Sequence, residues 1–205
     1  MIPTYKAVID ETLDTGMFVI SLVESPAVEV DFLKFGKAKK ELKYSITDEE
    51  KQKVFGVVMT ADTPIYRCDE GGEYYVVFDK ETIAKMAEKY FKNGNQNNVD
   101  TEHNMILEDG VTLTQMFIKD NSNGISPKGF EKVSDGSLFA EFHITNNEIW
   151  DAVKQGEYKG FSLAGTFILE QQFSKAKEKV NVTKEEKYFE DIMDMINKLE
   201  KKYKK

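Results

Sequence analysis

Cysteine, arginine and histidine are scarce in this chain of 205 residues, and each shortage limits its chemistry. Cys68 is the only cysteine, which excludes an internal disulfide and any metal site built from several cysteines. It lies between two apolar runs, where we expect a turn, and we interpret it as an inert thiol because no histidine is near in sequence. Arg67 is the only arginine, so the chain has a single guanidinium group for bidentate hydrogen bonding. Imidazole chemistry is confined to His103 and His143.

The chain also lacks long apolar runs and an excess of positive charge. No apolar stretch approaches the roughly 20 residues that span a bilayer, and residues 1–14 lack the basic start and apolar stretch of a signal peptide. We therefore expect synthesis in the cytosol and no membrane partner. The formal net charge of −8 argues against nucleic-acid binding, which favours a basic face. The 40% hydrophobic content is typical of a folded domain with a sizeable core.

Hydrophobic periodicity predicts an α+β domain, in which short antiparallel strands are combined with two helices. A polar connector at residues 36–52 includes Thr47 and Glu50, a capping-box pair that predicts one helical turn. Residues 121–136 collect Asn, Gly, Ser and Pro, and are predicted to form a flexible surface loop. The expected strands fall at 17–23, 53–66, 73–78, 113–121, 137–145 and within 157–173.

Both predicted helices carry recognisable ends. Asp79 is the expected N-cap of the first helix and Gly94 follows its last turn, while Asn146 and Gly156 bound the second helix. Five residues of the first helix recur at helical spacing and are predicted to face the core: Ile83, Met86, Ala87, Tyr90 and Phe91.

Residues 174–205 differ in composition from the preceding 173. They are rich in Lys and Glu and contain no glycine or proline, which predicts a charged amphipathic helical tail after a first domain at 1–173. Its apolar stripe covers about two heptads, fewer than an autonomous coiled coil needs. The tail therefore either packs on its own domain or serves as a docking or self-association helix. The stripe consists of Phe189, Ile192, Ile196, Leu199 and Tyr203.

Ser162 and His103 are the residues whose types permit nucleophilic catalysis. A serine hydroxyl needs an imidazole within hydrogen-bond reach to take its proton, and usually a third group to orient that imidazole. Ser162 is flanked by Gly160 and Gly165, and glycines let a backbone approach a substrate and present N–H groups to an oxyanion. From pattern alone, a serine near two glycines is more often structural, and a lone histidine after acidic residues is usually hydrated at the surface.

Three segments carry a family resemblance. The opening GMFVISLVESPAVEVDFLKF, the segment VDTEHN and the segment EIWDAVKQGEYKGFSLAG occur in this order and span most of residues 15–170. They resemble the XkdF-like serine proteases of phages and prophages, within the wider group of prohead proteases related in fold to herpesvirus assembly proteases. The resemblance implies a compact, mainly antiparallel β-barrel with peripheral helices. It also implies cleavage of scaffold and capsid proteins inside the assembling prohead, in the cytoplasm of a bacterial host.

The resemblance assigns roles to individual residues of this chain. His103 becomes the general base and Ser162 the nucleophile. Herpesvirus-type enzymes place a second histidine after the serine, but His143 precedes Ser162 here, and their paired arginines have no counterpart. An N–H group near Gly165, or a water held there, is the expected oxyanion donor. The third catalytic member is predicted to be acidic: Glu102, with Asp100 and Glu141 as alternatives.

Three functions follow from these observations. The first is a maturation serine endopeptidase, without metal or organic cofactor, that cleaves phage scaffold and major capsid proteins and associates as a dimer or higher oligomer. The second is a non-catalytic structural module with the same fold, associated with capsid or scaffold. The third is an unrelated hydrolase of small esters, which has the same serine and histidine as its only support.

Overall fold

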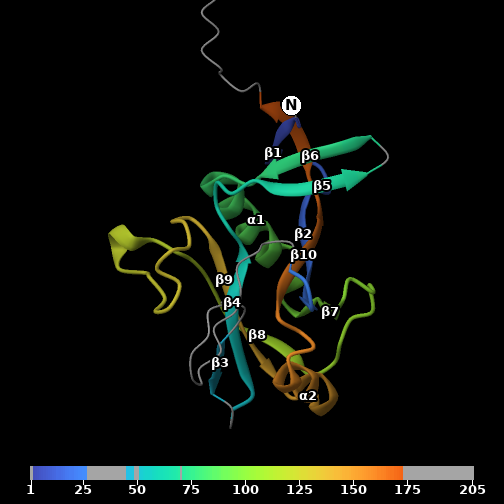
Figure 1. The fold of residues 1–205 in the computed structure, drawn as a ribbon, viewed down its shortest axis with the longest axis vertical. Helices are drawn as coiled ribbons and strands as arrows, with labels where there is room; N and C mark the ends of the chain where they lie inside the picture. Colours follow the sequence, from blue (N-terminus) through green and yellow to red (C-terminus); the bar gives the residue numbers. More distant parts are fainter. Residues whose placement is uncertain (1, 27–44, 49–50, 70, 173–205) are drawn as a thin grey trace, which may run out of the picture. The chain divides into compact units, whose positions relative to one another are not determined.

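The computed structural model describes residues 2–26, 45–48, 51–69 and 71–172. The chain divides into two compact units, Met1–Gln172 and Phe173–Lys205. The second unit lies outside the described residues, so the helical tail stays a prediction. Within the first unit, the described residues form three β-sheets and two α-helices, with short 3-10 helices at Asn95–Asn97 and Asn121–Asn123 (Figure 1).

The α+β class agrees with the sequence, whereas the described strands do not close into the barrel that the resemblance implied. The first sheet has the order β11 (Ile168–Gln172), β1 (Thr4–Val8), β6 (Gly72–Val77), β5 (Ile65–Asp69). The second has the order β10 (Gly160–Thr166), β2 (Gly16–Val23), β7 (Val99–Thr101). The third has the order β3 (Ser45–Asp48), β4 (Lys53–Met59), β9 (Leu138–Ile144), β8 (Val111–Ile118).

Strand β2 is the centre of the second sheet, where it pairs antiparallel with β10 and parallel with β7. Figure 1 shows β2 and β10 running side by side along most of their length. After Thr166 the chain passes through Phe167 into β11, which pairs with β1 of the first sheet. The Phe167 ring packs edge-on against Phe78, with 4.9 Å between ring centroids. The β10–β11 connection therefore ties two sheets together.

The helix ends are as predicted. Helix α1 spans Lys80–Lys92, and the Asp79 carboxylate accepts the Thr82 N–H at 2.8 Å. Helix α2 spans Asn147–Gln155, and the Asn146 side chain accepts the N–H groups of residues 148 and 149. Gly94 and Gly156 adopt left-handed backbone conformations after the two helices, as glycine does at helix C-termini.

Alternating residues of the strands build the main core. Four alternating residues of β9 are completely buried: Leu138, Ala140, Phe142 and Ile144. The Phe142 ring lies 5.1 Å from that of Phe161 on β10, which joins the second and third sheets. On α1, Ile83, Met86, Ala87 and Tyr90 face this core. The prediction was wrong for Phe91, which is 49% exposed.

Two local predictions were wrong because strand pairing overrode the helix-cap and turn signals. Thr47 lies in β3, which pairs with β4, rather than in a helical turn. Cys68 lies in β5, exposed and opposite Glu73, rather than in a turn. The loop predicted at 121–136 does lie at the surface and is mostly exposed, and buried Lys119 donates to its carbonyl groups at residues 130, 131 and 133. No helix among the described residues is long and apolar enough to cross a membrane.

Candidate active site

A row of three buried polar residues crosses the second sheet. Ser21 on β2 lies directly opposite Ser162 on β10 and, on its other side, opposite Asp100 on β7. Ile20 and Leu22 belong to the main core, so alternation along β2 turns Ser21 to the opposite face of the sheet. The side chains of directly paired residues point to the same face of a sheet, so Ser162 and Asp100 lie on the same face as Ser21. Ser21 and Asp100 are 0% exposed and Ser162 is 6% exposed.

A tight turn that follows β7 places His103 beside this row. The Asn104 N–H donates to the Thr101 carbonyl at 3.1 Å, which closes a four-residue turn with Glu102 and His103 at its centre. Both central residues have positive φ, 53° and 56°, and Met105 follows with φ 61°. Such values favour glycine or asparagine, and each costs about 1–2 kcal/mol for other residues. Local strain of this kind is concentrated at functional sites.

The imidazole of His103 contacts Ser21 directly. The Ser21 Oγ and the His103 Nδ1 are 2.8 Å apart, although the two residues are 82 positions apart in sequence. His103 is itself exposed, so its ring covers the buried serine from the solvent side. The contact therefore brings a base to the strand that lies between Asp100 and Ser162.

The carboxyl group of Asp100 holds the same loop in place. Its Oδ2 accepts the Met105 N–H at 2.9 Å, and the Glu108 N–H donates to the Val99 carbonyl at 2.7 Å. The other oxygen, Oδ1, is buried and has no hydrogen-bond partner among the described residues. A buried polar atom without a partner is costly, and in native proteins it often marks a functional site.

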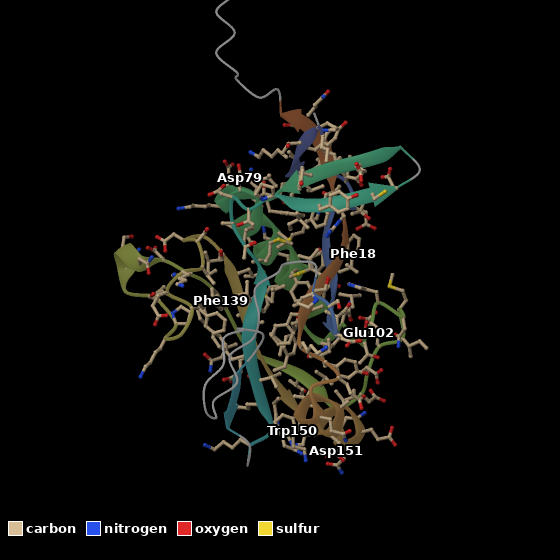
Figure 2. The ribbon with its side chains drawn as sticks, viewed as in Figure 1. Phe18, Asp79, Glu102, Phe139, Trp150 and Asp151 are labelled. Atoms are coloured by element: carbon tan, nitrogen blue, oxygen red, sulfur yellow. The ribbon has the colours of Figure 1, made fainter. Side chains whose placement is uncertain are left out.

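The other acidic residues considered from sequence are engaged elsewhere. The Glu102 Oε1 accepts the N–H of Glu24 at 2.5 Å, just beyond the end of β2 (Figure 2). Glu141 lies on β9 in the third sheet, where its carboxylate is bonded by Lys53 at 2.7 Å and by Thr114 at 2.9 Å. Of the three acidic residues, Asp100 is the one that shares a row with the serines.

The remaining candidates have structural explanations in this fold. His143 lies on β9, half-buried between Lys53 of β4 and Thr112 of β8. A Cβ atom on Gly165 would lie 2.1 Å from the Gly16 carbonyl oxygen, so close approach of β10 to β2 requires glycine there. The described residues contain no cluster of three or more His, Cys, Asp or Glu side chains that could hold a metal ion.

Sequence reasoning missed Ser21. The signal that could have found it is its position as the only polar residue in MFVISLV, an apolar run predicted to be a strand. A buried hydroxyl in such a strand needs a partner, which could have drawn attention to a distant histidine. The register that places it beside Ser162 and Asp100 depends on which strands pair, and that cannot be read from the run itself.

Serine hydroxyls, an imidazole and a buried carboxyl group in one cluster are typical of serine hydrolases. The family described as "Putative phage serine protease XkdF" has a model that matches residues 42–170, more than half of the chain, and the chain belongs to this family. His103, Ser162 and Asp100 lie within the matched range, whereas Ser21 lies outside it. No curated protein and no solved structure matches the chain.

Proposed function

We propose that the chain is a phage serine endopeptidase that cleaves scaffold and major capsid proteins during head assembly. The observation that carries the proposal is the 2.8 Å contact between the Ser21 Oγ and the His103 Nδ1, which brings an imidazole to a strand adjoining Ser162. Membership of the protease family supports the reaction type. The phage origin of that family supports scaffold and capsid proteins as the substrates. The proposal includes a fold related to that of the herpesvirus assembly proteases.

Ser162 is the favoured nucleophile of the two serines. Among the described strands it lies on β10, at the edge of the three-stranded sheet, whereas Ser21 lies on β2, which is paired on both sides. A substrate backbone can approach an edge strand more closely than a strand with neighbours on both sides. Ser162 also retains a slight exposure, 6%, whereas Ser21 has none.

Ser21 then orients the base. With the Nδ1–H of His103 donating to the Ser21 Oγ, the imidazole keeps its Nε2 lone pair for the proton of Ser162. Asp100 lies across the β2–β7 pair from Ser21, and its Oδ1 is buried without a hydrogen-bond partner among the described residues, so it supplies the negative charge beside the serine and the imidazole. In this arrangement Ser21 and Asp100 together fill the position of the third catalytic member, and Glu102 holds the turn through Glu24.

The reaction follows the serine protease scheme. The Ser162 Oγ attacks the scissile carbonyl carbon while its proton moves to His103. The peptide C–N bond breaks as His103 returns that proton to the leaving amine, which leaves an acyl group on Ser162. A water molecule, deprotonated by His103, attacks the acyl carbon and releases the free serine and the new carboxyl terminus. No cofactor enters this scheme.

Co-expression with the phage scaffold and major capsid proteins tests the proposal. Wild type should create new termini, mapped by mass spectrometry, that are absent with Ser162→Ala and His103→Ala. His143→Gln is the matched control, because it removes the other histidine from the third sheet and should leave the cuts in place. Cuts that persist with Ser162→Ala would refute the nucleophile assignment. A folded wild type that makes no cuts among assembled partners would favour the structural module.

A further inference from the structure

A groove begins beside the candidate nucleophile. It has a volume of about 490 Å³ and includes Ala164 of β10 and Val19 of β2 in its lining. These two residues are paired with each other, two positions along their strands from the Ser162–Ser21 pair. Two residues of a strand span about 7 Å, so one end of the groove lies within reach of a peptide bound at Ser162. Met105, from the loop that carries His103, also lines it.

The walls of the groove are mainly apolar. Large apolar or aromatic side chains from β2, β4, β6 and β10, and from the residues that follow β6 and β10, line it: Phe18, Met59, Tyr74, Phe78, Leu163 and Phe167. Figure 2 labels Phe18 on β2. The histidine loop extends this apolar surface, because Met105, Ile106 and Leu107 are 70%, 67% and 53% exposed. Adjoining apolar side chains in solvent are typical of a surface that binds another chain.

Among the described residues that line the groove, one is charged, and it is the only arginine of the chain. Arg67 is half-buried on β5, and its Nη1 donates to the Tyr66 carbonyl at 3.0 Å. Although the chain has 36 acidic residues, none of those described forms an ion pair with Arg67. Burial lowers the pKa of Arg67, and a guanidinium nevertheless stays protonated. A partly desolvated cation in an apolar groove strongly favours a carboxylate partner.

We infer that this groove is a substrate subsite for an apolar peptide segment with one acidic side chain, which pairs with Arg67. The inference rests on the proposed function, since it names the substrate class of the same site. The apolar walls bind the neighbouring side chains of the segment, and the guanidinium selects Glu or Asp over neutral residues. An acidic residue should therefore recur at one fixed distance from the cut.

Binding can be tested separately from catalysis. Ser162→Ala would be titrated by fluorescence anisotropy with fluorescein-labelled octapeptides that have a central Leu-Phe pair and one Glu moved through the other six positions. Each peptide has a Gln twin. We expect one Glu position to bind at least about tenfold more tightly than its twin, a gain of the size of a charge-assisted hydrogen bond. Adding Arg67→Gln should remove that difference, and Arg67→Lys should retain part of it.

Cleavage supplies the second arm. Wild type and Arg67→Glu would digest the Glu and Gln peptides and a third set in which Lys replaces Glu. Lys85→Gln on α1 is the control for the loss of a surface cation. Wild type should favour Glu, and Arg67→Glu should favour Lys at the same position. Equal binding of Glu and Gln twins at every position would overturn the subsite, even if cleavage occurs. Selective binding without cleavage would keep the subsite and refute the proposed function instead.

Discussion

The Ser21 Oγ lies 2.8 Å from the His103 Nδ1, so the central strand of a three-stranded sheet contacts a strained turn at the end of its neighbour. This contact fixes one nitrogen of the imidazole and leaves the opposite nitrogen for chemistry. Ser21 is completely buried, and Ser162 lies directly across from it on β10. In the proposed mechanism the buried serine orients the base, and the serine on the edge strand reacts.

Ser21→Ala is expected to lower kcat by about 10- to 1000-fold, because the imidazole loses the group that orients it. A fluorophosphonate probe should still label Ser162, more slowly, and intact-mass and peptide mapping locate the adduct. Ser21→Thr keeps the hydroxyl and should recover part of the rate. A role limited to packing would give no such recovery and would leave the pH profile of kcat unchanged. An adduct on residue 21 of the wild type would instead make Ser21 the nucleophile.

The third catalytic position can be decided by comparing two isosteric variants. Asp100→Asn changes the buried carboxyl group beside Ser21, and we expect activity to fall at least about 100-fold. Glu102→Gln keeps an oxygen acceptor for the Glu24 N–H and should change activity by less than about threefold. Circular dichroism checks that both variants fold. The opposite order of effects would restore Glu102 as the third member.

The sequence predicted those parts of the fold that depend on local patterns. The strand around Ile20 and the caps at Asp79 and Asn146 follow from periodicity and capping chemistry, which act within a few residues. The two residues assigned to catalysis by resemblance, Ser162 and His103, lie on and beside the same three-stranded sheet.

The row Asp100–Ser21–Ser162 could not be predicted, because it depends on pairing between strands far apart in sequence. Strand β7 has only three residues, too few for a periodic signal. The turn that presents His103 has Glu and His at positive φ, positions where turn statistics favour Asn and Gly. Local propensity therefore pointed away from the conformation that builds the site.

Asp79 makes the stability of α1 dependent on pH. Burial raises its pKa, but hydrogen bonds from Lys6 and from the Thr82 N–H outweigh burial and hold the pKa below its ordinary value of 3.8. The folded state therefore gains stability at neutral pH, and this gain is lost as the pH falls through the lowered pKa. Asp79→Ala should cost about 1 kcal/mol in urea unfolding at pH 7 and clearly less at pH 3. Asp151→Ala, at an exposed surface ion pair, is the control and should change stability by less than about 0.5 kcal/mol.

Gly165→Ala should damage both stability and activity, because two backbones meet where the new methyl group would lie. The added Cβ would be 2.1 Å from the Gly16 carbonyl oxygen, so β10 must move away from β2 three residues after Ser162. We expect a loss of about 2–4 kcal/mol, or roughly 10 °C in Tm, and reduced kcat in the folded fraction. Gly71→Ala is the matched control, since its Cβ would meet only a side-chain oxygen of Asp69 at 3.1 Å. Calorimetry measures the loss of stability, and peptide cleavage measures the loss of activity. An unchanged Tm would show that β10 and β2 lie far enough apart to hold a methyl group at residue 165.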